Sequence, residues 1–407
     1  MPSRRAFLAS LGATGLTATA GCLGGFDGDP GTDEEYDWPT GGGDEWNSRA
    51  VPNGVAPRDD PTVDGTHEFD GTPAGDPVVT AGTVLLNTGV DVVALDREDL
   101  TPRWTVASDD NDAFRYTGAP AVADGVAYVP ESDALVARDL DTGERLWSRA
   151  FEYVFGETTP LVVEHGDDRR VVIGAGEYLR AFDGATGERQ WERRLDGIVR
   201  RAAARAAASV YGVVYVATAG GALYAVDGDG RVHWSRTVTA GIRTAPSVVA
   251  SRDPDGESVR GSGDVVVGAG DGSVRCFDPT GKPRWHADLR GFVEGGIAVG
   301  HDGVFAASGG RLYALNAKNG NRAWRTEIGD AVRPTPPALV GDTVYVGGSR
   351  LHAIGVDGGV GVGSVRVGET RFEHEVDGGV SHVTAADGTL FATVATGTGG
   401  GRLVVLS

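Results

Sequence analysis

The chain is poor in cysteine, methionine and aromatic residues, and rich in glycine. Two cysteines, one methionine and 7% aromatic residues occur among 407 residues, whereas glycine accounts for 64. A large, glycine-rich chain with few aromatic residues is typical of many short strands joined by tight turns. At this length two or three average domains would fit, but large all-β folds often form a single unit.

Lysine is almost absent, because only Lys282 and Lys318 occur, and the basic side chains are otherwise arginines. Asp and Glu number 57 against 37 Lys and Arg, which gives a formal net charge of −20. Such a surface resembles that of proteins from salt-saturated habitats, such as those of halophilic archaea. An ordinary soluble acidic protein is the alternative. In either case the charge repels phosphate backbones, so nucleic acid is not an expected partner.

Residues 1–22 are expected to be an export signal. Ser3-Arg4-Arg5-Ala6-Phe7-Leu8 resembles the twin-arginine motif, with Arg4 and Arg5 as its pair, and a weakly apolar stretch follows at residues 9–20. That stretch is too short and too rich in small residues for a membrane span. Thr19-Ala20-Gly21-Cys22 resembles a lipobox, although Thr19 stands where leucine is usual. The resemblance implies lipidation of Cys22, anchoring on the outer face of the cell membrane, and no internal disulfide with Cys276.

Residues 23–37 are predicted to be a disordered tether, since they are rich in Gly and Asp and have no apolar periodicity. Residues 38–407 are predicted to form the folded part. Their first segment contains Trp38, Asp44, Trp46 and Asn47, and it resembles an entry segment found in many exported repeat proteins. We expect the two tryptophans to pack against one face of the fold, and residues up to 65 to contribute little to stability.

An internal repeat dominates the rest of the chain. A phrase such as Ala181-Phe182-Asp183-Gly184-Ala185-Thr186-Gly187-Glu188-Arg189-Gln190-Trp191 recurs with a tryptophan every 39 to 51 residues. Each phrase follows an alternating apolar run that predicts a buried strand, and its Asp and Gly predict a tight turn. The tryptophans are interpreted as structural docking residues that cap the layer between repeats. They are Trp104, Trp147, Trp191, Trp234, Trp285 and Trp324.

This phrase resembles the tryptophan-docking motif, A-x-D-x-x-T-G-x-x-x-W, of the pyrroloquinoline-quinone (PQQ) type repeat. The chain is in this respect similar to haloarchaeal PQQ-like repeat proteins. The resemblance implies an all-β fold, an eight-bladed β-propeller of four-stranded antiparallel blades. Eight first-strand signatures support the count, such as Asp76-Pro77-Val78-Val79. The last blade lacks its outer strand, and a propeller must close its ring. We therefore expect residues 66–69 to pair with residues 403–406, with Phe69 facing inward and His67 in the place of the docking tryptophan.

Catalytic and metal-binding motifs are scarce. PQQ-dependent alcohol dehydrogenases carry a vicinal cysteine pair and a calcium-holding Glu, Asn and Asp, and no such set is identifiable here. The eight His residues show no zinc spacing. We therefore expect neither catalytic residues nor a metal, and no cofactor, although PQQ remains an alternative.

One cluster of arginines forms a candidate ligand site. These residues are all expected in the links just before first strands, which often line a channel mouth in propellers, and there they could attract an anionic or carbonyl-bearing ligand. Ordinary loop arginines paired with Asp and Glu are the alternative. The six are Arg115, Arg200, Arg201, Arg205, Arg243 and Arg333.

Two functions are compatible with these features. The first is a non-enzymatic platform, exported and lipid-anchored, that binds a cell-envelope protein or a small ligand as a monomer. Bacterial relatives of this repeat class include the lipoprotein subunit of the outer-membrane β-barrel assembly machine, a role that needs an outer membrane and does not carry over to an archaeal surface. The second is a quinoprotein dehydrogenase that uses PQQ.

Overall fold

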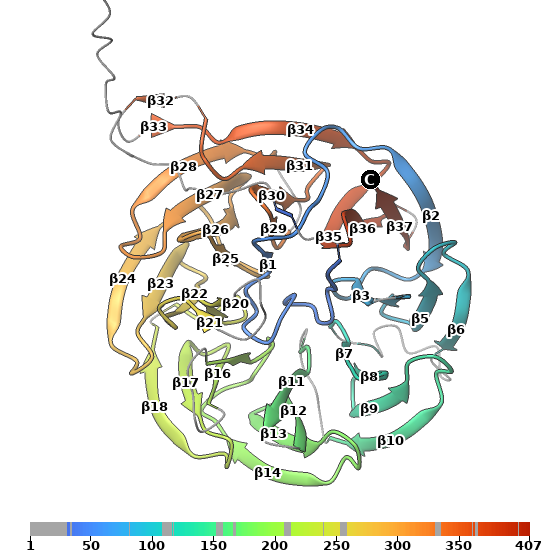
Figure 1. The fold of residues 1–407 in the computed structure, drawn as a ribbon. Coiled ribbons are helices and arrows are strands. Elements are labelled where there is room, and N and C mark those ends of the chain that lie inside the picture. Colours follow the sequence, from blue (N-terminus) through green and yellow to red (C-terminus); the bar gives the residue numbers. More distant parts are fainter. Residues whose placement is uncertain are drawn as a thin grey trace, which may run out of the picture.

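Eight antiparallel sheets are arranged as the blades of a β-propeller around a central axis (Figure 1). The structure is a computed structural model that describes residues 31–32, 35–80, 82–107, 116, 118–151, 158–165, 168–206, 213–238, 240–252, 259–329, 335–359, 361–362, 365–397 and 399–407. Within these residues all regular structure is strand, and no helix is long and apolar enough to cross a membrane. The predicted fold class and the predicted blade count are confirmed.

Each blade runs from an inner strand at the axis to an outer strand at the rim. The first four blades are β3 (Val78–Thr80), β4 (Thr83–Asn87), β5 (Asp91–Asp96) and β6 (Pro102–Ala107); β7 (Ala121–Ala123), β8 (Val126–Pro130), β9 (Ala134–Asp139) and β10 (Arg145–Ala150); β11 (Leu161–His165), β12 (Asp168–Ala175), β13 (Tyr178–Asp183) and β14 (Arg189–Arg194); and β15 (Ala204–Arg205), β16 (Val214–Ala217), β17 (Ala222–Val226) and β18 (Val232–Thr237).

The remaining blades follow the same order. They are β19 (Ser247–Val248), β22 (Val265–Gly268), β23 (Ser273–Phe277) and β24 (Pro283–Asp288); β25 (Ala298–Gly300), β26 (Gly303–Ser308), β27 (Arg311–Asn316) and β28 (Arg322–Glu327); β29 (Ala338–Val340), β30 (Thr343–Val346), β31 (Arg350–Gly355) and β34 (Glu369–Glu375); and β35 (Gly379–Ala386), β36 (Thr389–Ala395), β37 (Gly400–Leu406) and β2 (Val63–Asp70). Two small hairpins, β20–β21 (Ser251–Arg252 and Val259–Arg260) and β32–β33 (Gly361–Val362 and Val365–Arg366), and the short β1 (Ala50–Val51) complete the set.

Burial follows the position of a strand within its blade. The second strands, such as β16 and β30, are buried at every residue, because both of their faces meet neighbouring blades. The outer strands, such as β6 and β24, alternate between exposed and half-buried residues. The apolar runs of the sequence therefore lie between the blades, and the polar alternation marks the rim.

Each of the six docking tryptophans joins its own blade to the next one. Each indole Nε1 donates a hydrogen bond of 2.7–3.0 Å to a backbone carbonyl in the turn between the third and fourth strands of the following blade. The indole ring covers a turn glycine there; Trp147, for example, lies against Gly187. In the seventh blade Phe372 takes the place of tryptophan and packs with Tyr345, their ring centroids 6.3 Å apart.

The ring is closed by β2, which pairs with β37 and brings the two ends of the propeller into one blade. Phe69 is half-buried and packs on the core, as expected. The position expected for His67 is wrong, however. Gly65 pairs with Val405 at the position where Trp324 pairs with Ala314 in the sixth blade, so Gly65 stands in the place of tryptophan. His67 lies two residues further along the same face, opposite Leu403.

Leu100 compensates for the missing tryptophan. It occupies the turn position that is glycine in most blades, adopts a φ of +59° and is 8% exposed. A Cβ on Gly65 would lie 2.8 Å from its Cδ1. The large and the small residue have thus exchanged sides at this junction, so that the interface stays filled.

Candidate functional site

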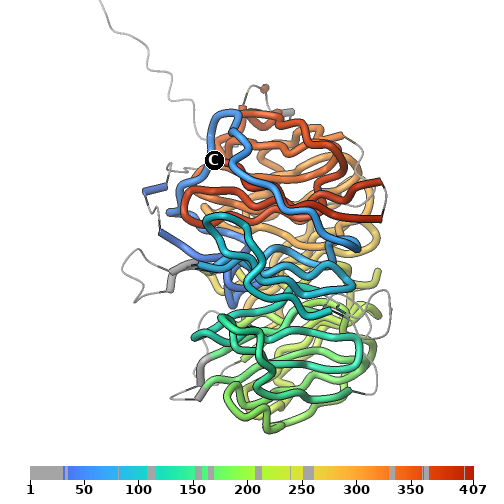
Figure 2. The backbone as a smooth tube through the Cα atoms, turned by 90° about the vertical axis from the view of Figure 1, so that its right-hand side faces the viewer, coloured from blue at the N-terminus to red at the C-terminus, as the bar shows by residue number. Residues whose placement is uncertain are grey.

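Residues 38–51 run through the centre of the disc and meet the blades in turn. Carbonyl oxygens of this segment accept hydrogen bonds from inner-strand amides of six blades, at 2.6–3.0 Å. These donors are Val79, Val122, Arg205, Val248, Val299 and Leu339. Figure 1 shows the segment (blue) crossing the centre, and Figure 2, which views the disc edge-on, shows its flanking part lying on one face.

Trp38 and Trp46 are core residues. They are 0% and 3% exposed and belong to apolar clusters formed with the strands of several blades. The expectation that they pack against one face is therefore wrong, because the segment is threaded into the channel. Its tryptophans are buried among apolar residues of the blades.

Arg49 ties this segment to the ring. Its Nη1 and Nη2 donate to both carboxylate oxygens of Asp76, at 2.9 and 2.8 Å, and its Nε donates to the carbonyl of Pro337 at 2.8 Å. The guanidinium also lies 5.8 Å from the ring centroid of Trp38. Burial would raise the pKa of Asp76, but the charges of Arg49 and then of His382 outweigh it and hold that pKa well below its usual range.

Asp44 shapes the turn that precedes Arg49. Its carboxylate accepts hydrogen bonds from the amides of Trp46 and Ser48, both at 2.9 Å, and from the Ser48 hydroxyl at 2.5 Å. These bonds favour the ionised form, but burial dominates and raises the pKa of Asp44 to about 7. The turn therefore holds a carboxyl group that changes charge near neutral pH.

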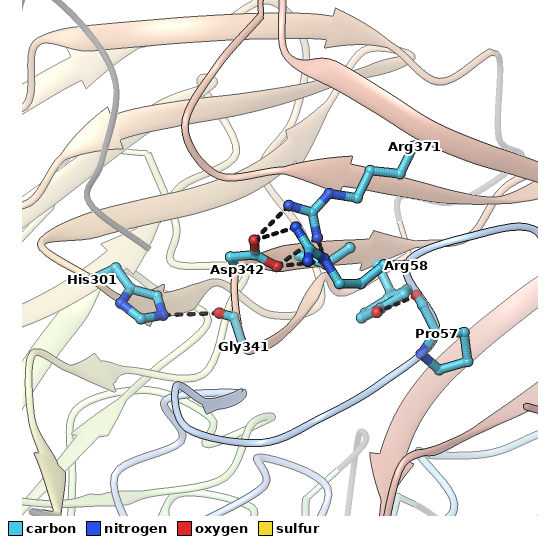
Figure 3. A network of polar contacts seen from close by, with 8 residues as sticks. Pro57, Arg58, His301, Gly341, Asp342 and Arg371 are labelled. Carbon is cyan, nitrogen blue, oxygen red and sulfur yellow. Dashed lines mark hydrogen bonds and ion pairs between the residues drawn. The ribbon is translucent and has the colours of Figure 1, made fainter. Parts of the chain in front are cut away.

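A second network fixes the chain where it leaves the centre (Figure 3). Asp342 accepts two hydrogen bonds from Arg371, at 2.5 and 2.7 Å, and one from Arg58 at 2.9 Å. Tyr345 donates to the carbonyl of Pro57 at 2.7 Å. Burial would raise the pKa of Asp342, but the Arg371 hydrogen bonds, and then the charges of Arg371 and Arg58, lower it overall.

An axial cavity of about 70 Å³ remains beside residues 38–51. Glycines, Asp76 and His382 line much of it, together with Arg201 from a link between blades. The Nδ1 of His382 lies 3.5 Å from an Asp76 oxygen and has no hydrogen-bond partner among the described residues. Small apolar residues form most of the cavity wall, and the cavity has room for little more than a few waters.

The predicted arginine cluster is only partly assembled at the channel mouth. Arg201 lines the cavity, donates to the carbonyl of Arg243 at 3.0 Å and lies 3.6 Å from Glu294. Arg200 and Arg243 are exposed. Arg205 lies in β15 and pairs with Glu45 of the central segment at 3.2 Å, whereas Arg115 and Arg333 lie outside the described residues.

Sequence reasoning missed Phe292, whose side chain is the most exposed large apolar group among the described residues, at 65%. It follows Gly291 in the link before the sixth blade. That link runs beside the preceding one, since Thr244 bridges Gly295, and Arg201 contacts both. We call this surface the link patch; it comprises Arg200, Arg201, Arg243, Phe292 and Glu294.

Other chemistry is limited within the described residues. They contain no cluster of three or more His, Cys, Asp or Glu side chains that could hold a metal ion. Cys276 is a buried free thiol whose pKa is raised by burial. Arg4, Arg5 and Cys22 lie outside the described residues.

Comparison with known proteins identifies the family. A family model described as "Outer membrane protein assembly factor BamB" matches residues 63–158, 91–279 and 254–406, and together these matches span every blade. The chain belongs to this family of PQQ-repeat propellers. An outer membrane protein assembly factor BamB from Bordetella pertussis is 30% identical over 245 residues, which are 58% of this chain and 60% of the relative. The chain thus spans about three fifths of the length of that curated relative.

Solved structures of lower identity share the fold. BamB from Moraxella catarrhalis has a TM-score of 0.62 at 18% identity, over 85% of this chain and 99% of that one. The quinohemoprotein alcohol dehydrogenase ADHIIG from Pseudomonas putida HK5 has a TM-score of 0.72 at 14% identity, over 94% of this chain and 83% of that one. A propeller of this type is therefore common to assembly factors and to dehydrogenases, and the fold does not choose between them.

Proposed function

We propose that this BamB-like propeller is an exported, non-enzymatic interaction platform, and that the link patch binds an envelope protein. Phe292 carries the proposal. Its side chain is 65% exposed, and it lies in a link adjacent to those of Arg201 and Arg243, so this surface has the composition of a binding hot spot, in which aromatic residues and arginines dominate.

Charge supports the same surface. On a protein with a net charge of −20, the link patch has three arginines against one glutamate and so forms a local positive region. Such a region would steer an acidic partner to this face and repel it elsewhere. The proposed partner therefore presents an apolar side chain surrounded by carboxylates.

The family points to the same class of function. The Bordetella pertussis relative is named as an outer membrane protein assembly factor, and the family model has the same description. We carry over only the general role, a propeller that assembles with other envelope proteins. An outer membrane is not part of the proposal.

The quinoprotein alternative is disfavoured by the channel. Sites for cofactor-sized ligands usually have volumes of about 300–1,000 Å³. The axial cavity measures about 70 Å³, because residues 38–51 fill the centre of the ring. This small volume argues against the tricyclic PQQ, and Arg49 and Asp76 there are already paired with each other.

Crosslinking in intact envelopes tests the platform. Phe292→Ser combined with Arg243→Glu should reduce crosslinking to the principal envelope partner at least tenfold. Leu146→Ser is the matched control, since Leu146 is 50% exposed on the outer strand β10, away from the link patch. Full crosslinking by the double variant, or equal loss in the control, would contradict the proposal. Dye-linked alcohol oxidation after incubation with PQQ and calcium would instead establish the dehydrogenase.

Anchoring by Cys22 is part of the same proposal. A Cys22→Ser variant should appear in the medium with an unchanged melting temperature, because the residue precedes all strands of the propeller in the sequence. Since one acyl chain binds membranes only marginally, a two-chain lipid is implied. Membrane retention of this variant would argue against the anchor.

A further inference from the structure

The central segment accepts backbone hydrogen bonds from six of the eight blades, and the third and eighth blades are the exceptions among the described residues. In six blades the second residue of the inner strand donates its amide to residues 38–51, as Val122 does to Pro39 at 2.8 Å. Val162 holds the equivalent position in the third blade, opposite Val171 as Val122 is opposite Ala127. Among the described residues, no backbone acceptor is found for the Val162 amide.

The cause is a turn in the segment. Between Thr40 and Glu45 the chain makes a turn, in which Gly43 donates to the carbonyl of Thr40 at 2.9 Å. A cavity of about 270 Å³ remains between this turn and the second and third blades. We call it the blade-three gap; it is lined by Pro39, Thr40, Gly43, Asp44, Glu45, Ala121, Val122, Ala123, Asp124, Leu161, Val162, Arg169 and Arg205.

The gap has an apolar wall and a charged rim. Ala123 of β7 and Leu161 and Val162 of β11 contribute the wall. On the rim Arg205 pairs with Glu45 at 3.2 Å, and Arg169 pairs with Asp124, whose side chain is 77% exposed. These rim charges pair with one another. Asp44 also lines the gap, but burial raises its pKa to about 7, so below that pH the site offers no net attraction to a charged occupant.

We propose that the blade-three gap receives one extended, uncharged segment of a partner protein. A carbonyl of that segment accepts the Val162 amide and adds an inner strand to β11, as residues 38–51 do for six other blades. In the blades on both sides of the gap, Val122 and Arg205 already donate their amides to the central segment. The new segment would continue this row of backbone hydrogen bonds. Backbone pairing supplies affinity, and the wall selects a small or β-branched side chain.

This site is separate from the link patch. The gap extends toward Asp124, in the turn between the first and second strands, whereas the link patch lies at the other end of the inner strands. The proposal therefore does not depend on the function proposed above. It gives the molecule a second binding surface on the opposite face.

Amide hydrogen exchange resolved by NMR tests the gap. In the free protein the Val162 amide should exchange at least tenfold faster than that of Val122, which is the matched bonded position. The uncharged peptide acetyl-Val-Thr-Val-amide, titrated to millimolar concentration, should slow Val162 exchange roughly tenfold, the factor expected for one added hydrogen bond. Acetyl-Asp-Thr-Asp-amide should have no effect.

A filled gap provides the control. Ala123→Leu should abolish the peptide effect, whereas Ala150→Leu, at an exposed residue of β10, should retain it. The proposal fails if no saturable change occurs at Val162, or if both variants behave alike. It also fails if Val162 is protected in the full chain and becomes unprotected in a chain that begins at residue 31, since the occupant would then be the chain's own leader.

Discussion

Gly187 illustrates how closely each blade fits the next. A Cβ on this residue would lie 2.6 Å from Cδ2 of Trp147, and its φ is +68°. Gly388 has a similar φ of +78°, but nothing lies within 4 Å of a Cβ built there. The two glycines share the same backbone requirement and differ only in the tryptophan.

Substituting both glycines separates these effects. Gly388→Ala should cost about 1–2 kcal/mol of unfolding free energy, the usual penalty for a left-handed non-glycine residue. Gly187→Ala should cost about 1–3 kcal/mol more, because the indole must shift in a packed interface. Urea denaturation measures both values. Equal costs would mean that the docking contact tolerates an extra methyl group.

Asp44 should make stability depend on pH. Its pKa is raised by burial from 3.8 to about 7, so between these values the folded protein holds a proton that the unfolded chain has released. Stability therefore falls as pH rises from about 4 to about 7, and this contribution is constant outside that window. Asp44→Asn should remove the decline, while its amide oxygen can still accept the bonds from Trp46 and Ser48. Parallel slopes for the two proteins, in denaturant melts from pH 4 to 8, would contradict the raised pKa.

Single elements also depend on their neighbours, as the junction between β2 and the first blade shows. There Gly65 and Leu100 replace the tryptophan and glycine found at other junctions. The junction holds one large residue and one small one, and either side can supply the large one. Two large residues would overpack it, and two small residues would leave a cavity.

A double-mutant cycle tests this exchange. Gly65→Trp should destabilise by about 1–3 kcal/mol through overpacking, and Leu100→Gly by about 2–4 kcal/mol through loss of a buried side chain. The double variant should recover more than half of the summed loss, because it restores the arrangement of the other blades. Additive losses would show that the two residues do not interact.

For the whole molecule, the N-terminal region is more important than the sequence suggests. Residues 38–51 connect six blades through the channel, and β2 closes the ring. The expectation that residues up to 65 contribute little to stability conflicts with this arrangement. We instead expect a graded response to truncation.

Three truncated chains define that gradation. A chain starting at residue 31 should melt within about 2 °C of the full protein. A chain starting at residue 59 should melt much lower but still cooperatively, since it loses the central segment and the Arg58–Asp342 contact. A chain starting at residue 72 should aggregate, because the edge of β37 is left bare. Calorimetry and light scattering follow these outcomes, and a stable chain from residue 59 would show that the channel segment is dispensable.

Salt should stabilise the whole protein. A net charge of −20 produces self-repulsion in the compact state, and salt screens it. The melting temperature should therefore rise between about 0.1 and 2 M KCl, where the Debye length falls below roughly 3 Å. A flat or falling curve would argue against adaptation to high salt.

The sequence by itself determined the repeat, the blade count and the partner strands of the closure. These are local signals, since strand alternation and the Asp and Gly of each turn act within a few residues, and the same phrase recurs around the ring. Phe69 faces the core because alternation fixes which face of β2 is buried. Alternation cannot distinguish strand registers that differ by two residues, however. The sequence therefore predicts His67 at the tryptophan position, which Gly65 occupies.

Only the tertiary structure decided the centre and the surfaces. Arg49 and Asp76 meet across 27 positions of sequence, and no periodic pattern links them. Phe292 lies in a short apolar pair with Val293 that reads as part of a strand, but folding buries Val293 and leaves Phe292 in solvent. The blade-three gap lies between the turn at residues 40–45 and β11, and it depends on how the central segment spans the closed ring.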